Sequence, residues 1–436
     1  MLSDRIEGKW IDAFSETFAR CGVKPGDSAA ILSETQSRQL NVHLAELALL
    51  RLGARPFHLV LPTPRNPHPV PVRSTGASVA IGGLAPVVSA LGQAGFVVDC
   101  TLEGLMHAPE TPAILKAGAR ILYVSNEHPE ALERMRPDDR LEARVRAAAK
   151  MLRGSKRMTV TSAAGTSLDV DMAGASTVGI WGWTEKPGTL AHWPGGIVVS
   201  FPKAGTVNGT LVLDRGDVNL TFKRYLEAPV TLTLAQDYVT RIEGSGADAE
   251  MMRSYLAAWG EREAYAVSHV GFGMNPNARY EALAMYDQRD FNGTELRAVA
   301  GNFLFSTGAN EFAGRYTAGH FDIPVMKTTI TVDNTVAVRD DIYREHPWVV
   351  RNMYRAFCEA RDMAVDGLYD TDALRVSLPW LIHHIEETWR VLGKNFWAYG
   401  LEPNRPTLEA IGQYVYEQGL SPRVVGADEL FASDIE

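Results

Sequence analysis

The pattern of hydrophobic and polar positions divides the chain into three parts. In the first part, short apolar runs that are typical of buried strands alternate with stretches of helical spacing. The apolar runs are 28–33, 55–61 and 119–125, and the helical stretches are 36–52 and 127–153, the latter predicted as one long exposed helix. Because strands that alternate with helices favour an open, mostly parallel sheet, residues 1–153 are expected to form an N-terminal α/β domain.

The second part, residues 154–339, is dense in Val, Thr and Gly and alternates with period two, as antiparallel strands do. Strands are predicted at 158–162, 209–213, 217–222 and 229–234, a helix at 247–259 and a closing hairpin at 326–338. Two Gly- and Asn-rich segments, 268–276 and 305–310, lie between them, and the first is expected to be a loop. This part is predicted to be a β-rich domain, and the histidines and carboxylates it contains, among them His269, His320 and Asp322, make it the candidate metal-binding catalytic domain.

The third part, residues 340–436, is a predicted helical C-terminal extension. Its aromatic- and charge-rich stretches predict helices at 347–365, 379–392 and 407–419. The fold class of the whole chain is therefore expected to be α/β.

Composition excludes several classes of protein. Of the residues, 46% are hydrophobic and 22% are charged, as in ordinary globular proteins. The net charge of -9 without a basic block argues against a nucleic-acid binder, and no glycine-rich nucleotide fingerprint is present. Cys21, Cys100 and Cys358 are too dispersed for a disulfide framework or a cysteine–zinc site.

No membrane attachment is expected either. The uncharged stretch 74–98 is long enough to cross a bilayer, but it contains Pro86 and several glycines. It is predicted to be a turn, a helix and a strand within a globular domain. The first residues lack the apolar core of a secretory signal, so the expected location is the cytoplasm.

The most informative motif is Gly319-His320-Phe321-Asp322. Residues i and i+2 of a strand point to the same face, so His320 and Asp322 are placed to reach one metal ion. A further histidine, His269, lies in the Gly-rich segment before them. Two histidines and one carboxylate bind one face of Fe(II) and leave positions for a substrate and O2. The alternative is that His320 is a hydrogen-bonded histidine in a turn.

Other side chains are candidates for catalysis or substrate binding. In a Pro- and Gly-rich segment, Glu185 is a candidate base, second metal ligand or surface carboxylate, and His192 a substrate contact or a packed ring. His107 follows an apolar strand and is either a general base or a solvated loop histidine. Arg297 and Ser306 flank the strand that leads to the metal motif. Arg297 is a candidate to hold a negatively charged substrate oxygen and Ser306 to orient a hydroxyl, and an ordinary structural role is the alternative for both.

Residues 1 to about 338 resemble the aminopeptidase T-like (M29) metallopeptidase superfamily. The markers are Gly165-Thr166, Glu185-Lys-Pro-Gly188, Pro194-Gly-Gly196, Gly271-Phe-Gly-Met-Asn-Pro276 and Gly319-His-Phe-Asp322. Within this superfamily the chain is similar to the 2,5-dihydroxypyridine 5,6-dioxygenases, which are mononuclear iron enzymes of nicotinate-type catabolism.

This resemblance implies a ligand set and a base. The positions that hold iron in that family match His269, His320 and Asp322, so the implied cofactor is Fe(II). A Leu-His pair on a mobile loop is linked there to substrate deprotonation, and here it is Met106-His107, so the leucine differs.

The implied reaction opens a dihydroxylated N-heteroaromatic ring such as 2,5-dihydroxypyridine next to the nitrogen. Both atoms of O2 enter the product, which for this substrate is N-formylmaleamate. Arg297 and Ser306 match pocket positions, His192 would help Arg297 to orient the ring, and Glu185 is a substrate-contact candidate. The expected partners are a small aromatic substrate and O2, in a homo-oligomer.

Two alternatives remain open at this point. A two-metal aminopeptidase would use Glu185 as an added ligand, although His269 stands where a peptidase would offer a glutamate. A non-catalytic binding protein is suggested by the C-terminal extension, which resembles the end of 4,5-dihydroxyphthalate decarboxylase-like proteins. That likeness runs through Pro347-Trp348, 377–381, 396–400 and 416–420. Since only the end of such a protein is present, the extension is expected to be a structural cap or an oligomer contact.

Overall fold

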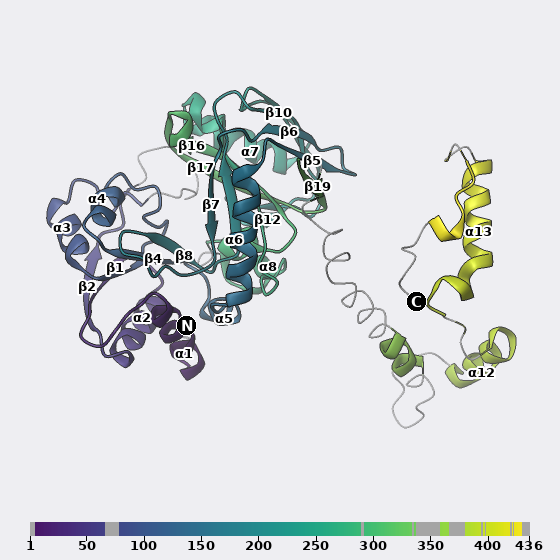
Figure 1. The fold of residues 1–436 in the computed structure, drawn as a ribbon, viewed down its shortest axis with the longest axis horizontal. Coiled ribbons are helices and arrows are strands. Elements are labelled where there is room, and N and C mark those ends of the chain that lie inside the picture. Colours follow the sequence, from purple (N-terminus) through teal and green to yellow (C-terminus); the bar gives the residue numbers. More distant parts are fainter. Residues whose placement is uncertain are drawn as a thin grey trace. The chain divides into compact units, whose positions relative to one another are not determined.

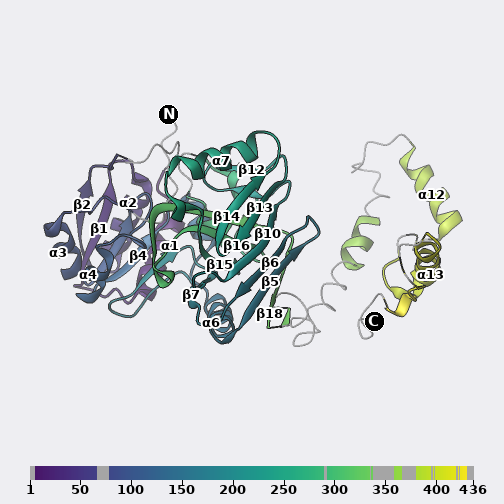
Figure 2. The same ribbon diagram turned by 90° about the horizontal axis from the view of Figure 1, so that it is seen from above.

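The computed structural model describes residues 5–65, 78–288, 292–333, 335–336, 358–365, 380–393, 396, 398–418, 421 and 423–429. Contacts divide the chain into two compact units, residues 1–336 and 337–436. The first unit carries a five-stranded parallel sheet, a five-stranded and a seven-stranded antiparallel sheet and a two-stranded sheet, with helices around them (Figures 1 and 2). This mixed architecture confirms the predicted α/β class.

The first sheet is parallel and has the strand order β2-β1-β3-β4-β8. Its strands are β1 (Ser28–Glu34), β2 (Arg55–Leu61), β3 (Phe96–Cys100), β4 (Arg120–Val124) and β8 (Leu190–Trp193). Side chains alternate between its faces: Ala29 and Ile31 pack with α1 (Gly8–Arg20) and α2 (Gln39–Arg51). Ala30 and Leu32 pack on the other face with α3 (Ala85–Gln93) and α4 (Thr111–Lys116).

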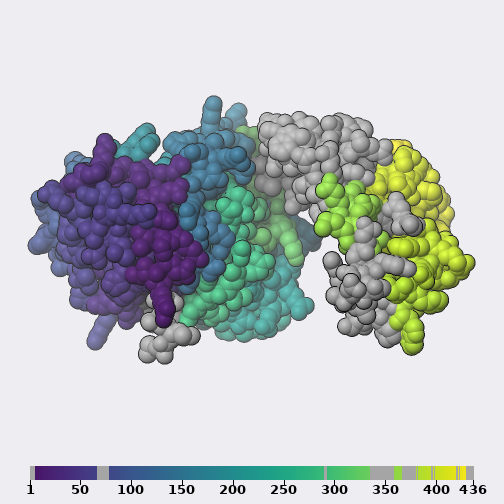
Figure 3. Space-filling view, turned by 90° about the horizontal axis from the view of Figure 1, so that it is seen from below, coloured from purple at the N-terminus to yellow at the C-terminus, as the bar shows by residue number. Residues whose placement is uncertain are grey.

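The order of these strands has a consequence for binding. The chain goes from β1 to β2 on one side and from β3 to β4 on the other, and such a reversal of strand order usually marks a binding crevice at the carboxyl ends of the strands. The N-terminal helices α1 and α2 pack on one face of the sheet, and the N-terminal part of the chain forms the purple surface in Figure 3. The segment 74–98 contributes α3 and the start of β3 to this unit. In the described part of the chain, no helix has the length and apolar character needed to span a membrane.

The single long helix predicted at 127–153 is wrong. The chain forms α5 (Pro129–Arg134) and α6 (Asp139–Gly154), which are separated at Pro137. Proline disfavours helical backbone in the residue before it, and Asp138 starts the second helix by accepting a hydrogen bond from the Arg140 N–H. The second helix is also not fully exposed, because one side of it, including Leu141 and Val145, is buried.

Two antiparallel sheets follow. The five-stranded sheet has the order β17-β16-β15-β9-β7, and the seven-stranded sheet has the order β14-β13-β10-β6-β5-β18-β19. The five strands are β7 (Ser176–Ile180), β9 (Ile197–Phe201), β15 (Val267–Gly273), β16 (Phe303–Asn310) and β17 (Arg315–Val325). The seven are β5 (Arg157–Ser162), β6 (Ser167–Asp171), β10 (Val207–Leu213), β13 (Val230–Ala235), β14 (Tyr238–Glu243), β18 (Thr328–Val332) and β19 (Thr335–Val336).

The loop predicted at 268–276 is wrong, because most of that segment is the buried central strand β15. Its glycines serve close packing of strands. A Cβ on Gly271 would lie 2.0 Å from the carbonyl oxygen of Val198 in β9. Glycine composition alone does not distinguish this use from a loop.

Other predicted elements are confirmed or shortened. Helix α7 (Ala247–Ala258) and the closing hairpin β18–β19 are present. The strand predicted at 217–222 is wrong beyond the two residues of β11 (Val218–Asn219), which pairs with β12 (Arg224–Tyr225). The chain turns there because the Asn219 side chain accepts a hydrogen bond from the Phe222 N–H. Two short helices, α8 (Ala282–Met285) and α9 (Thr294–Ala298), complete the first unit together with the short 3-10 turns η1 (Arg262–Tyr265) and η3 (Glu311–Ala313).

The second unit contains helices α12 (Leu381–Leu392) and α13 (Leu401–Glu417) and the turn η4 (Ala427–Glu429). The first helix agrees with the prediction at 379–392, and the second begins six residues before the predicted 407. Of the predicted helix 347–365, residues 358–365 are helical and the rest lies outside the described residues.

Candidate metal centre and active site

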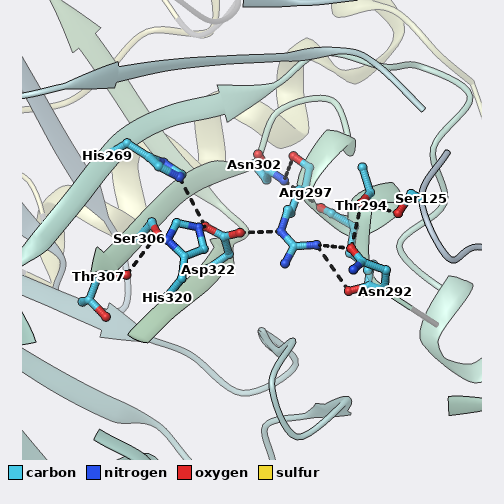
Figure 4. A network of polar contacts seen from close by, with 12 residues as sticks. Ser125, His269, Asn292, Thr294, Arg297, Asn302, Ser306, Thr307, His320 and Asp322 are labelled. Carbon is cyan, nitrogen blue, oxygen red and sulfur yellow. Dashed lines mark hydrogen bonds and ion pairs between the residues drawn. The ribbon is translucent and has the colours of Figure 1, made fainter. Parts of the chain in front are cut away.

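Three candidate metal ligands lie on one face of the five-stranded sheet. His269 in β15 pairs with Ser306 in β16, and Ser306 pairs with Asp322 in β17. Directly paired residues in antiparallel strands point to the same face, and His320 shares that face with Asp322. The ligand atoms of the two histidines and the carboxylate all lie within 4.8 Å of one another (Figure 4).

The chemistry of this donor set fits a divalent transition metal. The Nε2 atoms of His269 and His320 lie 3.4 and 3.2 Å from Asp322 Oδ1, a buried oxygen without a hydrogen-bond partner among the described residues. Burial lowers the pKa of His269 to about 3, so its imidazole is neutral and offers a lone pair. Burial raises the pKa of Asp322, but His320 and Arg297 outweigh it and hold that pKa well below its usual value.

Arg297 in α9 orients the carboxylate of Asp322. Its Nε donates to Asp322 Oδ2 at 2.5 Å, and its Nη1 donates to the carbonyl and side-chain oxygens of Asn292 at 3.3 and 3.0 Å. Partners of this kind fix the direction in which a ligand carboxylate points. Oδ1 is thereby left facing the two histidines (Figure 4).

The side chains of His269, His320 and Asp322 line a cavity of about 290 Å³. One wall is apolar and comes from alternate residues of β7, β9 and β16: Val178, Ile180, Ile197, Val199, Phe201 and Leu304. Phe201 also lies edge-on to the His269 ring, with centroids 5.4 Å apart. A space of this size with an apolar wall and a polar end suits one substituted aromatic ring.

His107 and Met106 line the cavity from the loop that follows β3. The ring of His107 lies 5.3 Å from that of His320, centroid to centroid. Burial, with a contribution from His320, lowers the pKa of His107 to about 4, so the ring is neutral near pH 7 and is able to accept a proton. Asp99 in β3 holds the base of the loop by accepting hydrogen bonds from the Thr101 and Leu105 N–H groups.

His192 also lines the cavity, but the predicted turn-rich setting is wrong, because the residue lies in strand β8. Its Nδ1 is 2.7 Å from the carbonyl oxygen of Pro194. A carbonyl only accepts, so Nδ1 carries the hydrogen. Burial lowers the pKa of His192 to about 4, which leaves a neutral ring whose Nε2 is an acceptor.

The structure does not bring Glu185 and Ser306 into the cavity. Glu185 is exposed and lines a separate depression with Thr184 and Lys186. Ser306 lies in the row of the ligands but is fully buried, and its hydroxyl donates to the Thr307 carbonyl at 3.4 Å. Ser306 therefore lies in the sheet between the candidate ligands His269 and Asp322, where its side chain is packed.

Replacing Glu185 with Gln is therefore expected to leave metal content and turnover close to those of the wild type. Turnover with saturating substrate and metal counting in the purified protein check this. A loss of one metal equivalent would instead favour the two-metal arrangement.

Several polar residues in the cavity had no distinctive signal in the sequence. They are Glu103, Tyr123, Asn292, Thr294 and Glu311, joined at the mouth by Phe312, which is 52% exposed. Asn292 donates to the Tyr123 hydroxyl at 3.2 Å, which links a segment next to α9 to the end of β4. Only the fold brings these residues together, since 169 positions separate that pair.

Fold and site together define a class of protein, an α/β protein with a candidate His–His–Asp metal centre in a ring-sized cavity. The family model described as 2,5-dihydroxypyridine 5,6-dioxygenase matches residues 9–342. The 2,5-dihydroxypyridine 5,6-dioxygenase of Pseudomonas putida is 36% identical over 315 residues, which cover 71% of this chain and 89% of that enzyme. The chain belongs to this dioxygenase family.

Solved structures agree with this assignment. The 2,5-dihydroxypyridine dioxygenase from Pseudomonas putida matches with a TM-score of 0.70 and 33% identity, over 76% of this chain and 98% of that one. AmpT from Thermus thermophilus matches with a TM-score of 0.50 and 16% identity, over 74% of this chain and 95% of that one, which shows a shared fold alone. The predicted family resemblance is confirmed.

A shorter match concerns the second predicted resemblance. A segment of 98 residues is 31% identical to a 4,5-dihydroxyphthalate decarboxylase from Comamonas testosteroni. It covers 22% of this chain and 30% of the decarboxylase, so most of that enzyme has no counterpart in the match. This confirms in part the likeness predicted for the C-terminal extension.

Proposed function

We propose that this protein is an Fe(II)-dependent dioxygenase that opens a dihydroxylated N-heteroaromatic ring such as 2,5-dihydroxypyridine, giving N-formylmaleamate. The observation that carries the proposal is the convergence of His269, His320 and Asp322 at the polar end of a ring-sized cavity. Membership of the dioxygenase family supports the reaction class. A two-metal aminopeptidase is not favoured, because Glu185, the expected added ligand, lies outside the cavity.

The two histidines and the carboxylate would hold the metal, and two imidazole nitrogens with one carboxylate oxygen suit Fe(II). When bound, Fe(II) supplies the Lewis acidity and the redox activity that the reaction of O2 with an electron-rich ring requires. Arg297 keeps the Asp322 carboxylate aligned for this role. The electrons come from the ring itself, so no nicotinamide or flavin is needed.

The other side chains bind the ring and move its proton. Neutral His107 takes a hydroxyl proton from the substrate, which makes the ring more electron-rich. His192 accepts a hydrogen bond from the substrate at Nε2, since its Nδ1–H is committed to Pro194. The apolar wall, which includes Val199 and Phe201, packs on the ring and excludes water.

The deciding experiment is anaerobic reconstitution with Fe(II), followed by metal counting and O2 uptake with 2,5-dihydroxypyridine. We expect one iron per chain, one O2 consumed per ring and loss of the ring absorbance. 2-Hydroxypyridine, which lacks the second hydroxyl, is the matched control substrate and should not react. One iron without uptake would reject 2,5-dihydroxypyridine as the substrate, and two metals with oxygen-independent peptide hydrolysis would overturn the dioxygenase proposal.

A further inference from the structure

Helix α9, which carries Arg297, is held at both ends by buried side chains. At its start, one oxygen of Glu127, Oε1, accepts the Gly293 and Thr294 N–H groups at 2.8 and 2.7 Å. At its end, the side-chain amide of Asn302 donates to the carbonyls of Leu296 and Arg297 at 2.9 and 3.0 Å. A helix of five residues has little stability of its own, so these contacts, together with the ion pair between Glu295 and Arg134, hold it in place.

The contact at the start of α9 joins two distant parts of the chain. Glu127 follows β4 of the parallel sheet and is fully buried, whereas its partners lie 166 and 167 positions further on. Nearby, the hydroxyls of Ser125 and Thr294 lie 2.7 Å apart, and the Thr294 hydroxyl also donates to Asn292 at 2.9 Å (Figure 4). Asn292 is the residue whose two oxygens hold the Arg297 guanidinium.

Burial of a carboxylate costs folding free energy unless hydrogen bonds replace its hydration. The hydrogen bonds that Glu127 accepts therefore offset this cost. Burial and the nearby Glu295 raise the pKa of Glu127 to about 7, while its backbone donors and the charge of Arg297 oppose the rise. The other carboxylate oxygen, Oε2, has no hydrogen-bond partner among the described residues. The two amides of the α9 start are therefore its main polar contacts.

We propose that Glu127 is a positioning residue for the metal centre: it fixes α9, so that Arg297 aligns the carboxylate of Asp322. This inference rests on the proposed function and adds to it a residue outside the cavity. Glu127 contacts neither the candidate ligands nor the cavity, and it acts only through the chain of hydrogen bonds that ends at Asp322 Oδ2. Arg297 bonds a candidate ligand directly, and partners of that kind are worth about 10–100-fold in metal affinity or activity, which sets the upper bound for an effect that passes through it.

The test compares Fe(II) affinity, measured anaerobically against a competing chelator, in the wild type and in three variants of Glu127. Glu127→Ala is expected to bind Fe(II) more weakly, by up to about 10–100-fold. Glu127→Gln keeps an oxygen acceptor at the same position and is expected to bind with nearly wild-type affinity. Glu127→Asp shortens the side chain by one methylene but keeps a carboxylate, so its Fe(II) affinity should lie between those of the Ala and Gln variants. It also provides a test if the alanine variant does not fold.

Asp248 offers a matched control. It is also buried, and one of its oxygens accepts two adjacent backbone N–H groups, those of Glu227 and Ala228, at 2.8 and 3.2 Å. These residues do not line the cavity. Asp248→Ala should therefore cost thermal stability but leave Fe(II) affinity and the absorption bands of the Co(II)-substituted protein unchanged, whereas Glu127→Ala should shift those bands.

A double-mutant cycle with Arg297→Ala tests the route of the effect. If Glu127 acts through Arg297, adding Glu127→Ala to Arg297→Ala should weaken Fe(II) binding little further. Additive losses would overturn the proposed route. Wild-type affinity in Glu127→Ala, or equal losses in the Gln and Ala variants, would overturn the positioning role, whereas a wild-type protein that binds no Fe(II) would overturn the proposed function as well.

Discussion

His320→Ala is expected to abolish metal retention and to lower turnover by at least about 10³-fold, because a metal of this kind supplies several kcal/mol of the catalysis. The substitution leaves two donors, His269 and Asp322, which is too few to hold one face of the ion. It also leaves Asp322 without the neighbour that contributes most to lowering its pKa. Iron content after anaerobic reconstitution and initial O2 uptake are the measurements.

The fold should survive this change. His320 is opposite Gly308 in the neighbouring strand and points into the cavity, so its removal empties no packed core. Tyr316→Ala is a control in the same strand, since that side chain is 71% exposed and does not line the cavity. It should keep one iron per chain and full turnover. Full activity in His320→Ala would refute the ligand assignment.

The metal motif is the part of the site that sequence predicts best. His320 and Asp322 are two positions apart, and the period of a strand alone places them on one face. The third candidate ligand, His269, is harder to predict from the sequence, because it joins the other two only through the register of β15, β16 and β17. The segment around His269 is predicted as a loop because Gly271 and Gly273 are typical of turns. The sequence does not show the neighbouring strands against which these glycines pack.

The same reasoning explains what sequence does not reveal. The break in the helix predicted at 127–153 has a local signal in the sequence, because Pro137 lies between the two helices that form. Glu127 carries no comparable signal, because its two backbone partners lie more than 160 positions away and any backbone offers the same N–H groups. For Glu185 the sequence signal is misleading. Its Pro- and Gly-rich surroundings suggest a functional residue, but it is exposed and lies outside the cavity.

The site combines two sheets with separate tasks. The antiparallel sheet supplies His269, His320 and Asp322, whose rigid register sets the spacing of the donors. The carboxyl end of the parallel sheet supplies the loop with His107, and β8 supplies His192. Under the proposed function, metal binding and proton transfer depend on different elements, and substitutions are expected to separate the two functions.

His107→Ala is the substitution that tests this separation. It is expected to keep one iron per chain, because the ring is not one of the three candidate ligands, yet to slow turnover by about 10²–10⁴-fold through loss of a general base. Stopped-flow mixing of the anaerobic complex with O2 measures the rate, and metal counting establishes that the centre is intact. Added imidazole should restore part of the rate, because the substitution leaves a space of that shape in the cavity.

The neighbouring residue provides the matched control. Met106→Leu changes a side chain in the same loop and restores the leucine implied by the family resemblance, so turnover should stay close to that of the wild type. If His107→Ala turned over at the wild-type rate, the base would have to be another group, and His192 with its free Nε2 would be the next to test. If it lost iron instead, His107 would belong to the metal centre, and the division of tasks between the two sheets would be wrong.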